Sequence, residues 1–498
     1  MKKFNLTLLL LFVFVLSSCS QPEGKKTHTE FKAKAKKPNI LFVLLDDMGK
    51  EWVESYGAEE VKTPNIDRLA EGGMQFENVW SMPQCTPSRI TLLTGQYPWR
   101  HGWINHYDVP RWGHGAQFDA TMNLSFAKVM KKAGYKTCAA GKWQVNDFRL
   151  QPNAMSEHGF DEYAMWTGAE GGNVKVSQER YWDPYIHTKE GSKTYKGEFG
   201  EDIFTDFIID FMRKNKENPM MIYYPMCLPH GPLVHTPAEP NATGKMDKHK
   251  AMVRYTDIIL KKLTDALDEL KLRENTIIVW TTDNGTGGNI TGTMNGRRVR
   301  GGKTYLTENG VNAPFIVNCP GLVPSGVKTD ALIDFSDIFP TFAVLGGVSL
   351  SNEQEIDGKS FAPLLLGKTK VSSRDWIMAL GSNAATLEKG RVKNIYEFRD
   401  RVIRNKRFKA FVNTNQKINE IFDLSVDLEE ENNLIDSEDP EVVEALKAFD
   451  KVVQSLPAKD AQPKYSKLEG SLYDVDIEVL KKQHKKNRTK GNHAPKAN

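Results

Sequence analysis

The chain has 498 residues, of which 40% are hydrophobic and 26% are charged, and its formal net charge is +4. A single hydrophobic core usually stops growing below this length, so we expect one large domain and one smaller domain. The composition is that of an ordinary globular protein, and a net charge this small gives no indication of a nucleic-acid partner.

The N-terminus carries the pattern of an export signal. Lys2-Lys3 precede an apolar run from Leu8 to Leu16, which is too short for an ordinary membrane span. We therefore predict that residues 1–18 are a signal peptide. Leu16-Ser17-Ser18-Cys19 resembles a bacterial lipobox, in which the cysteine becomes lipidated, although an ordinary signal peptide with an incidental cysteine is the alternative.

This reading predicts an exported bacterial lipoprotein in the periplasm or on the cell surface, held at the membrane only through Cys19. The polar, Lys-rich residues 19–38 would form a flexible tether. The remaining cysteines are Cys85, Cys138, Cys227 and Cys319. Their wide spacing does not indicate a disulfide framework, and two of them lie in apolar runs, so we expect Cys138 and Cys227 to be buried free thiols.

Predicted strands and helices alternate over most of the chain. This alternation is typical of an α/β fold with a doubly wound central sheet flanked by helices, which we assign to residues 39–372. Ligands of such sheets bind beyond the carboxyl ends of the strands. Strands are predicted at 39–45, 76–80, 136–140, 220–226 and 276–280, and helices at 63–70, 123–133, 203–214 and 250–272.

The pattern changes near Ser373. Alternating segments at 376–379, 401–404, 408–412 and 418–424 predict antiparallel strands, and 441–456 predicts a helix. Residues 373–470 are therefore predicted to form a smaller C-terminal α+β domain with an antiparallel sheet. The last segment, 471–498, is basic, and disorder is its default interpretation, with contact to an anionic polymer as the alternative.

One short segment, Cys85-Thr86-Pro87-Ser88-Arg89, combines several features of an anion site. Pro87 suits the first turn of a helix and Gly95 can end it, which places Cys85 at the helix N-terminus. The unpaired N–H groups and the helix dipole favour negative charge there. Arg89 would lie one turn further on the same face, and this setting also favours a reactive sulfur.

Two pairs of oxygen-bearing residues follow predicted strands. Asp46-Asp47 ends the first strand, and Asp283-Asn284 ends a much later one. Either pair alone is most simply interpreted as a turn or cap. Taken together with the Cys85 segment they indicate a site for Ca²⁺, with Mg²⁺ as the alternative ion, because these hard cations prefer oxygen ligands.

These segments together resemble the type I sulfatases, whose signature is Cys-X-Pro-Ser-Arg, and the resemblance extends from about Asn39 to Asp436. It implies an alkaline-phosphatase-like fold. It also implies that a formylglycine-generating enzyme oxidises Cys85 to formylglycine (3-oxoalanine), whose hydrate attacks the sulfur of a sulfate ester. Asp46, Asp47, Asp283 and Asn284 would bind calcium together with an oxygen of that hydrate.

The resemblance also assigns cationic groups to the sulfate. Lys142 lies in Gly-Lys-Trp, His230 in Pro-His-Gly-Pro, and Lys303 five residues before Glu308 in Lys-Thr-Tyr-Leu-Thr-Glu-Asn-Gly. They match sulfate-binding positions of the family, with His230 or Lys303 as the acid that protonates the leaving alcohol. Arg89 would hold the hydrated aldehyde. Such cations suit a reaction that places more negative charge on sulfonyl oxygens.

One position departs from the family pattern. Many members have a histidine after Gly-Lys-Trp, which in the family removes a proton to expel sulfate, whereas this chain has Gln144. Glutamine is no base at neutral pH. Either His101, His230 or water takes the proton, or Gln144 only binds substrate and turnover is slowed. We favour subfamily variation with activity retained.

An exported enzyme of this kind suits a sulfated polysaccharide or oligosaccharide as substrate. The aromatic-rich segment 166–195, with Tyr181, Trp182 and Tyr185, could stack on sugar rings, although core packing is the commoner role of such residues. The alternatives are an arylsulfatase, a phosphodiesterase or phosphomonoesterase of the same superfamily, a cysteine-dependent phosphatase, and a surface glycan-binding lipoprotein without turnover.

Overall fold

The computed structural model describes residues 37–109, 115–166, 179–351, 354–383, 385–389 and 391–468. Their contacts place the described residues, from Lys37 onward, in one compact unit. The predicted signal peptide, Cys19, most of the tether and the basic tail lie outside the described residues. Within the described ranges, every helix is too short or too polar to cross a membrane.

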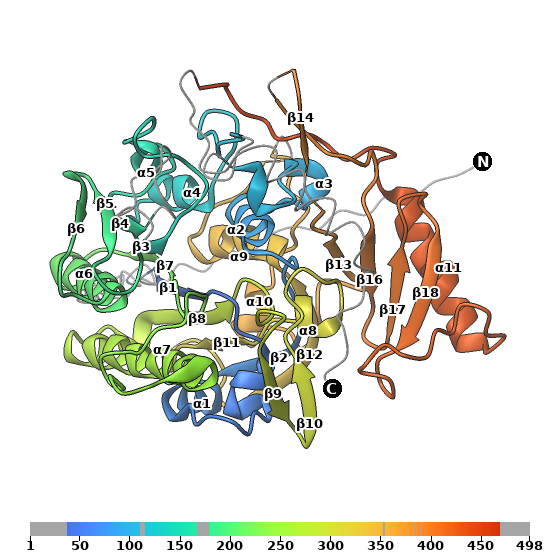
Figure 1. Ribbon diagram of the computed structural model, residues 1–498, viewed down its shortest axis with the longest axis horizontal. Coiled ribbons are helices and arrows are strands. Elements are labelled where there is room, and N and C mark those ends of the chain that lie inside the picture. Colours follow the sequence, from blue (N-terminus) through green and yellow to red (C-terminus); the bar gives the residue numbers. More distant parts are fainter. Residues whose placement is uncertain are drawn as a thin grey trace, which may run out of the picture. The chain divides into compact units, whose positions relative to one another are not determined.

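A mixed 10-stranded sheet forms the centre of the structure (Figure 1). Its inner strands run parallel to one another, whereas β11 is antiparallel to both of its neighbours. The strand order is β12 (Val327–Asp334), β2 (Met74–Trp80), β11 (Phe315–Asn318), β8 (Thr276–Thr282), β1 (Asn39–Leu45), β7 (Met220–Pro225), β3 (Lys136–Lys142), β4 (Glu162–Trp166), β5 (Tyr185–Thr188) and β6 (Gly191–Thr194).

Helices cover both faces of this sheet, which confirms the predicted α/β class. Strand β1 is apolar throughout because alternate side chains enter opposite cores: Phe42 lies in one hydrophobic cluster and Val43 in the other. The first core is closed by α2 (Cys85–Thr94), α4 (Phe126–Lys132), α9 (Ile338–Leu345) and α10 (Ala362–Leu365), and the second by α1 (Pro64–Glu71), α6 (Gly200–Asn215) and α7 (Gly244–Glu269) (Figure 1).

Several element bounds differ from the sequence prediction. Helix α4 begins at Phe126 rather than residue 123, because the Ser125 side chain caps it by accepting a hydrogen bond from the Lys128 N–H. Helix α7 begins at Gly244, before the predicted start. The short helices α3 (Pro98–His101), α5 (Ala154–Glu157) and α8 (Glu308–Val311) and the hairpin of β9 (Thr291–Met294) and β10 (Arg297–Arg300) were not predicted.

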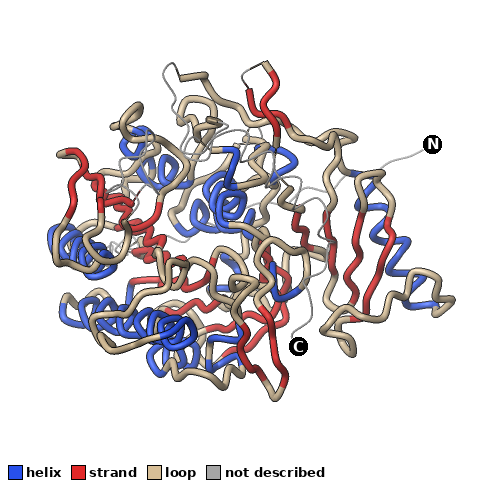
Figure 2. Tube along the Cα trace, viewed as in Figure 1, coloured by secondary structure: helices blue, strands red, loops and turns tan. Residues whose placement is uncertain are grey.

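The C-terminal region forms a second, antiparallel sheet, as predicted (Figure 2). The turn at 405–406 joins β16 to β17. Its core continues into the central sheet, since Trp80 at the end of β2 belongs to the same hydrophobic cluster. The strand order is β13 (Ile377–Leu380), β16 (Arg401–Arg404), β17 (Phe408–Val412) and β18 (Ile418–Asp423), with α11 (Pro440–Ser455) packed against it and a small hairpin of β14 (Thr386–Glu388) and β15 (Arg391–Lys393) nearby in sequence.

Candidate active site

The four predicted oxygen-bearing residues lie together at the carboxyl edge of the central sheet. Asp46 and Asp47 follow β1, and Asp283 and Asn284 follow the adjacent strand β8. The Asp47 N–H donates a hydrogen bond to Asp283 Oδ1 over 3.3 Å, and Asn284 Nδ2 donates to Asp47 Oδ1 over 2.7 Å. All four are buried, and Asp47 adopts a left-handed backbone with φ of 67°.

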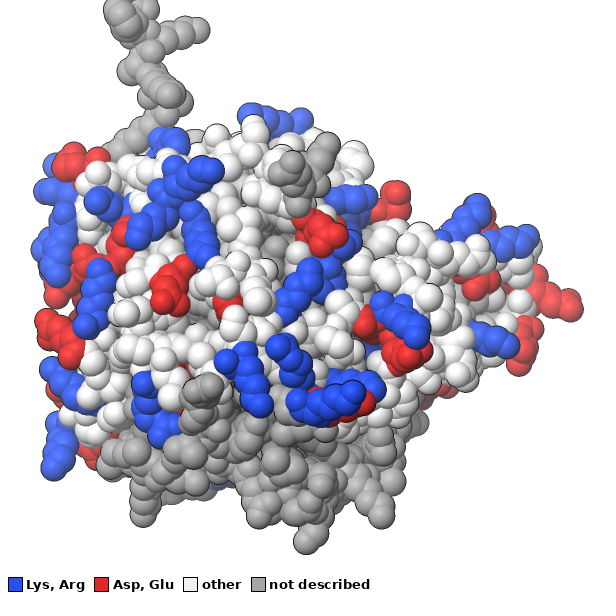
Figure 3. All heavy atoms as spheres, turned by 90° about the horizontal axis from the view of Figure 1, so that it is seen from above, with Lys and Arg blue, Asp and Glu red and all other residues white. Residues whose placement is uncertain are grey.

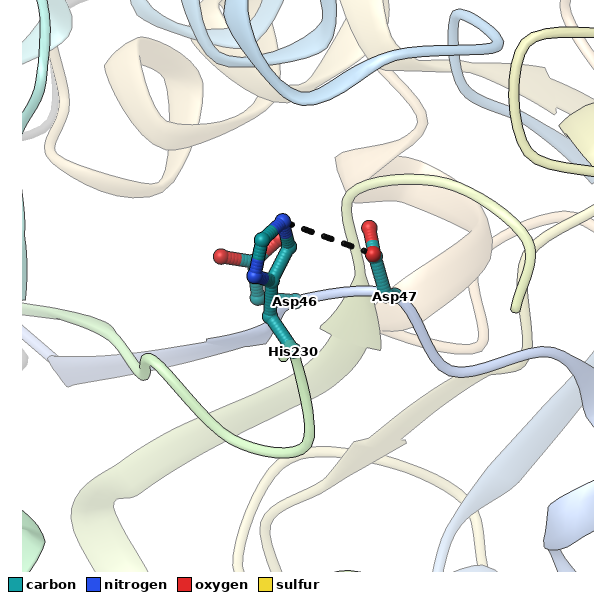
Figure 4. A group of neighbouring side chains, drawn as sticks. All are labelled: Asp46, Asp47 and His230. Carbon is teal, nitrogen blue, oxygen red and sulfur yellow. Dashed lines mark ion pairs between the residues drawn. The ribbon is translucent and has the colours of Figure 1, made fainter. Parts of the chain in front are cut away.

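Two oxygens of this cluster have no hydrogen-bond partner among the described residues. Asp46 Oδ1 and Asn284 Oδ1 are buried and accept no hydrogen bond. Burying such oxygens unpaired is costly unless a cation compensates them. Asp46, Asp47 and His230 present ligand atoms that all lie within 4.8 Å of one another (Figure 4). The residues present therefore fit a hard divalent cation.

Arg89 connects three elements of the site. Its Nε and Nη2 donate to Asp283 Oδ2 over 3.0 and 2.8 Å, and its Nη1 donates to the Lys142 carbonyl oxygen over 3.2 Å. Nη2 also lies 3.6 Å from Asp46 Oδ2. Asp283 is thereby engaged by Arg89 and the Asp47 N–H, whereas the close group of ligand atoms consists of Asp46, Asp47 and His230.

Cys85 is the first residue of α2, which ends at Gly95 in a left-handed conformation, as predicted. Its Sγ lies 3.8 Å from Gln144 Oε1, so the thiol can donate to the side-chain amide. Gln144 has a φ of 71°, which is uncommon for a non-glycine residue and typical of functional sites. The structure therefore brings the position that departs from the family pattern directly against Cys85.

The two predicted lysines neutralise the two aspartates after β1. Lys142 Nζ lies 2.5 Å from Asp46 Oδ2, and Lys303 Nζ lies 2.6 Å from Asp47 Oδ1. Burial alone would raise the pKa of Asp46, but Lys142 and the other nearby cations hold that pKa well below its ordinary value. Burial opposes the charge of Lys303, yet Asp47 raises its pKa above the ordinary value. Both lysines are thus fixed beside the carboxylates.

His230 faces this cluster from the loop after β7 (Figure 4). Its Nε2 lies 3.5 Å from Asp47 Oδ2, while its Nδ1 lies 3.0 Å from an Nη1 atom of Arg180 and 2.6 Å from the Gly231 carbonyl oxygen. Burial, with Lys303 nearby, lowers the pKa of His230 to about 3. The imidazole is therefore neutral at neutral pH in this environment. No sequence pattern indicates a role for Arg180.

Two buried side chains hold the His230 loop in place. Tyr181 Oη donates to the carbonyl oxygens of Cys227 and His230 over 2.6 Å each. Glu201 Oε1 accepts from the Cys227 and Leu228 N–H groups over 2.7 and 3.2 Å, and burial raises its pKa to about 7. Neither role was predicted. For Glu201, the sequence feature that could have indicated a buried role is an acidic residue on the apolar face of a helix.

The aromatic segment serves packing where the structure describes it. Tyr181 is buried, and Trp182 Nε1 donates to the His235 carbonyl oxygen over 3.0 Å. Tyr185 lies at the start of β5, and residues 167–178 are outside the described ranges. The expectation that Tyr181 stacks on a sugar ring is therefore not supported, because its ring is enclosed and its hydroxyl is used by the His230 loop.

His101, considered as a replacement base, is occupied elsewhere. Its Nε2 lies 3.1 Å from Thr91 Oγ1, and its Nδ1 accepts from the Trp103 N–H over 3.1 Å. It is buried, and burial lowers its pKa to about 3. Both ring nitrogens are used in core contacts, so the geometry does not favour a catalytic role. Cys138 and Cys227 are buried free thiols, as predicted.

Comparison with known proteins gives a consistent result. Residues 38–348 match the family model described as Sulfatase, and residues 301–456 match the model described as N-sulphoglucosamine sulphohydrolase, C-terminal. An N-acetylgalactosamine-6-O-sulfatase of Bacteroides thetaiotaomicron is 30% identical, and the similarity covers 88% of this chain and 96% of that protein. Human N-acetylgalactosamine-6-sulfatase is also 30% identical, over 66% of each chain.

Solved structures share the fold. The crystal structure of Ps i-CgsB superposes with a TM-score of 0.71 at 24% identity, and the match covers 90% of this chain and 97% of that chain. The same protein has been solved in complex with k-i-k-neocarrahexaose. A putative sulfatase, yidJ from Bacteroides fragilis, matches with a TM-score of 0.67 at 21% identity, covering 85% of this chain and 98% of that chain.

Proposed function

The chain belongs to the sulfatase family and is a sulfuric ester hydrolase, and from this we propose that it removes sulfate from a sulfated sugar of a polysaccharide or oligosaccharide. The first candidate is 6-O-sulfated N-acetylgalactosamine, because the Bacteroides relative named for that activity is similar over nearly its whole length. The observation that carries the proposal is the convergence of Cys85, Arg89 and the acid cluster at one edge of the sheet.

The oxygen cluster is the proposed cation site. Asp46, Asp47, Asp283 and Asn284 would hold Ca²⁺, with Mg²⁺ as the alternative, and the two unpartnered oxygens support this assignment. A bound calcium ion would supply positive charge that favours a negatively charged nucleophile and substrate. We further propose that a formylglycine-generating enzyme converts Cys85 to formylglycine, which supplies the nucleophilic oxygen.

The other residues bind and orient the sulfate ester. Lys142 and Lys303 point their ammonium groups at the two carboxylates after β1, and His230 presents its Nε2 to the same place. Their positive charges and N–H groups suit the sulfonyl oxygens, where negative charge grows during attack. The protonated Lys303 is the better candidate to protonate the leaving alcohol, because His230 is neutral in this environment.

The net reaction consumes water and gives an alcohol and sulfate. Gln144 contacts Cys85, and Arg89 lies one turn after Cys85 on α2, so both would fix the orientation of the reacting side chain. On the face drawn in Figure 3, basic and acidic side chains are interspersed. Recognition of an anionic polymer would therefore depend on contacts near the site more than on a uniform positive field.

The location of the protein is part of the proposal. The signal pattern and Cys19 support an exported lipoprotein, anchored by lipid at the periplasmic or outer surface. Such a position gives access to polysaccharide fragments outside the cell. Labelling with a radioactive fatty acid and its loss in Cys19→Ala would test the anchor, and a soluble unlabelled wild-type protein would contradict it.

The test of function pairs mass spectrometry with product detection. The protein is produced with a formylglycine-generating enzyme, the Cys85 peptide is weighed, and sulfate release is measured from 6-O-sulfated N-acetylgalactosamine oligosaccharides, other sulfated glycans and an aryl sulfate. We expect the formylglycine mass and release from a glycan, both absent in Cys85→Ala. Active protein with unmodified Cys85 would refute the mechanism, and preference for the aryl sulfate would favour the arylsulfatase alternative.

A further inference from the structure

A second group of buried charges joins α8 to the C-terminal sheet. Arg404 Nη1 on β16 donates to Glu308 Oε2 over 2.6 Å, and Lys409 Nζ on β17 lies 3.3 Å from Glu308 Oε1 and 2.5 Å from Glu430 Oε1. The Glu308 N–H donates to Glu430 Oε2 over 3.2 Å. We call Glu308, Arg404, Lys409 and Glu430 the bracing cluster. Glu308 is its centre, since it contacts the other three residues.

Helix α8, which begins at Glu308, packs directly on the two loops that carry catalytic groups. The Gly285 N–H donates to the Gly310 carbonyl oxygen over 3.0 Å. A Cβ atom on Gly285 would lie only 1.9 Å from the Asn309 carbonyl oxygen, and one on Gly302 would lie 2.5 Å from the Gly310 nitrogen. These contacts leave no free space, so a shift of α8 must shift both glycines.

The two glycines adjoin residues of the proposed site. Gly285 follows Asn284 directly, and Gly302 precedes Lys303 directly. The backbone that follows each glycine is also constrained, because the Lys303 N–H donates to the Thr286 carbonyl oxygen over 3.0 Å and Thr304 has a φ of 78°. The position of α8 therefore sets where the Asn284 amide and the Lys303 ammonium group lie.

The same helix is tied to the loop after Asp47. Asn312 Nδ2 donates to Glu308 Oε2 over 2.8 Å, and Asn312 Oδ1 accepts from Lys50 Nζ over 2.9 Å. Lys50 Nζ also donates to the Glu77 carbonyl oxygen over 2.6 Å. A continuous series of polar contacts thus runs from the C-terminal sheet through Glu308 to both sides of the oxygen cluster.

We propose that Glu308 is a positioning residue, held by Arg404 and Lys409 of the C-terminal sheet, which fixes Asn284 and Lys303 for binding of the cation and the sulfate ester. The inference deepens the proposed function and depends on it for the roles of those two residues. The family model for the C-terminal part begins at residue 301, so it already includes the Lys303 loop and α8 with the C-terminal sheet. That extent supports treating them as one unit.

The test compares wild type with Glu308→Gln, Arg404→Lys and the control Arg407→Met. Arg407 also pairs with acids of the C-terminal region, Asp423 on β18 and Glu441 on α11, and within the described residues it makes no hydrogen bond or ion pair with the bracing cluster. Hydrogen–deuterium exchange is measured in peptides covering 284–286 and 301–305, calcium affinity by calorimetry, and KM and kcat separately on the best sulfated substrate.

We expect exchange in both peptides about tenfold faster and calcium binding about tenfold weaker in Glu308→Gln, with a rise in KM. Arg404→Lys should show smaller changes of the same kind, and it becomes the deciding variant if Glu308→Gln does not fold. Arg407→Met should match wild type in all three readouts, even if its melting temperature falls.

Two outcomes separate the inference from the proposed function. If the variants only melt earlier, with exchange in both peptides equal to that of Arg407→Met, then the bracing cluster is merely structural and the inference is wrong. If wild type binds no calcium and releases no sulfate, the proposed function fails. The exchange comparison then still decides whether Glu308 controls the two loops.

Discussion

Two of the buried Arg–Asp pairs among the described residues, Arg374 with Asp337 and Arg89 with Asp283, differ in one respect. Arg374 donates to both oxygens of Asp337 over 2.6 to 2.8 Å and to Ser336 Oγ over 3.0 Å, and the remaining capacity of Asp337 is filled by backbone N–H groups. Arg89 holds Asp283 in a similar way, but the neighbouring oxygens Asp46 Oδ1 and Asn284 Oδ1 have no hydrogen-bond partner in the part of the chain that the structure describes.

The difference distinguishes a structural ion pair from a functional one. A buried pair whose polar atoms are all satisfied rigidifies the fold, whereas unpaired buried oxygens cost free energy that a bound cation would offset. Left-handed backbone at Asp47 and Gln144 adds further local strain to the second region. The Arg374 pair should therefore govern stability, and the Arg89 region should govern binding and turnover.

The largest expected effect is a contrast between two variants: Asp46→Asn should lose activity, and Asp337→Asn should lose stability. Asp46→Asn removes the charge that holds Lys142 and leaves the oxygen cluster with less negative charge, so we expect kcat/KM for sulfate release to fall about a thousandfold. Asp337→Asn should instead leave Arg374 short of a counter-charge and lower the free energy of unfolding by about 3–5 kcal/mol.

Sulfate-release kinetics and denaturant unfolding of both variants check this pair of predictions. The control is wild type assayed in the same buffer with saturating Ca²⁺. The comparison breaks down if Asp337→Asn loses activity per folded molecule as severely as Asp46→Asn does, because the two regions would then not have separate roles.

Glu201 is a third kind of buried acid: it has hydrogen bonds but forms no ion pair with any described residue. Its pKa in the folded state is about 7, above the ordinary 4.5, because burial disfavours the carboxylate. Because the pKa of Glu201 is higher in the folded state than in the unfolded state, its protonated carboxyl adds to the free energy of unfolding. This contribution is fully present below pH 4.5 and is lost as the pH rises through 7. The free energy of unfolding lost over this pH range is about 3 kcal/mol.

Glu201→Gln keeps an acceptor for the Cys227 N–H without the ionisation. We expect its free energy of unfolding to change by about 3 kcal/mol less than that of wild type between pH 4.5 and pH 8. Chemical denaturation at intervals across that range measures the difference. Glu239→Gln, which alters a half-buried pair with Arg254, is the control. Parallel pH profiles for wild type and Glu201→Gln would contradict the assignment.

Most of the oxygen cluster could be predicted from the sequence, because its residues lie at the ends of predicted strands. The apolar run Asn39–Leu45 indicates a buried strand, and acids directly after it must lie at the carboxyl edge where neighbouring strands also end. That argument brings Asp46, Asp47, Asp283 and Asn284 together without a structure. The family resemblance then supplied Lys142, His230 and Lys303.

The supporting residues could not be predicted in the same way. Glu308 and Arg404 are 96 residues apart in sequence, and their pairing depends on how the C-terminal sheet docks against α8. Arg180 reaches His230 from a segment whose sequence indicates only aromatic packing. Pairing of charges across distant elements follows from tertiary packing, to which local periodicity is not sensitive.

Calcium should bind the Arg89–Asp283 region, where buried oxygens lack partners, and should leave the Arg374–Asp337 pair unchanged. At a free concentration one hundred times the dissociation constant, binding to the folded state alone adds about 2.7 kcal/mol to the free energy of unfolding. We expect a rise of the melting temperature with Ca²⁺, reversed by a chelator, in wild type and in Arg374→Lys. The rise should vanish in Asp46→Asn. An equal rise in Asp46→Asn would place the cation elsewhere.

The smallest expected effect concerns Gln144. Its side chain contributes about one hydrogen bond to the group at position 85, so Gln144→Ala should lower kcat about fivefold to tenfold with little change in melting temperature. Gln144→His tests the missing base, and histidine tolerates the left-handed backbone better than most residues. A base acts only when deprotonated, so kcat of Gln144→His should rise with pH through about 6.5, a step that Gln144→Ala lacks. If wild type already shows that step and Gln144→Ala retains it, another group removes the proton, and the amide at position 144 only binds.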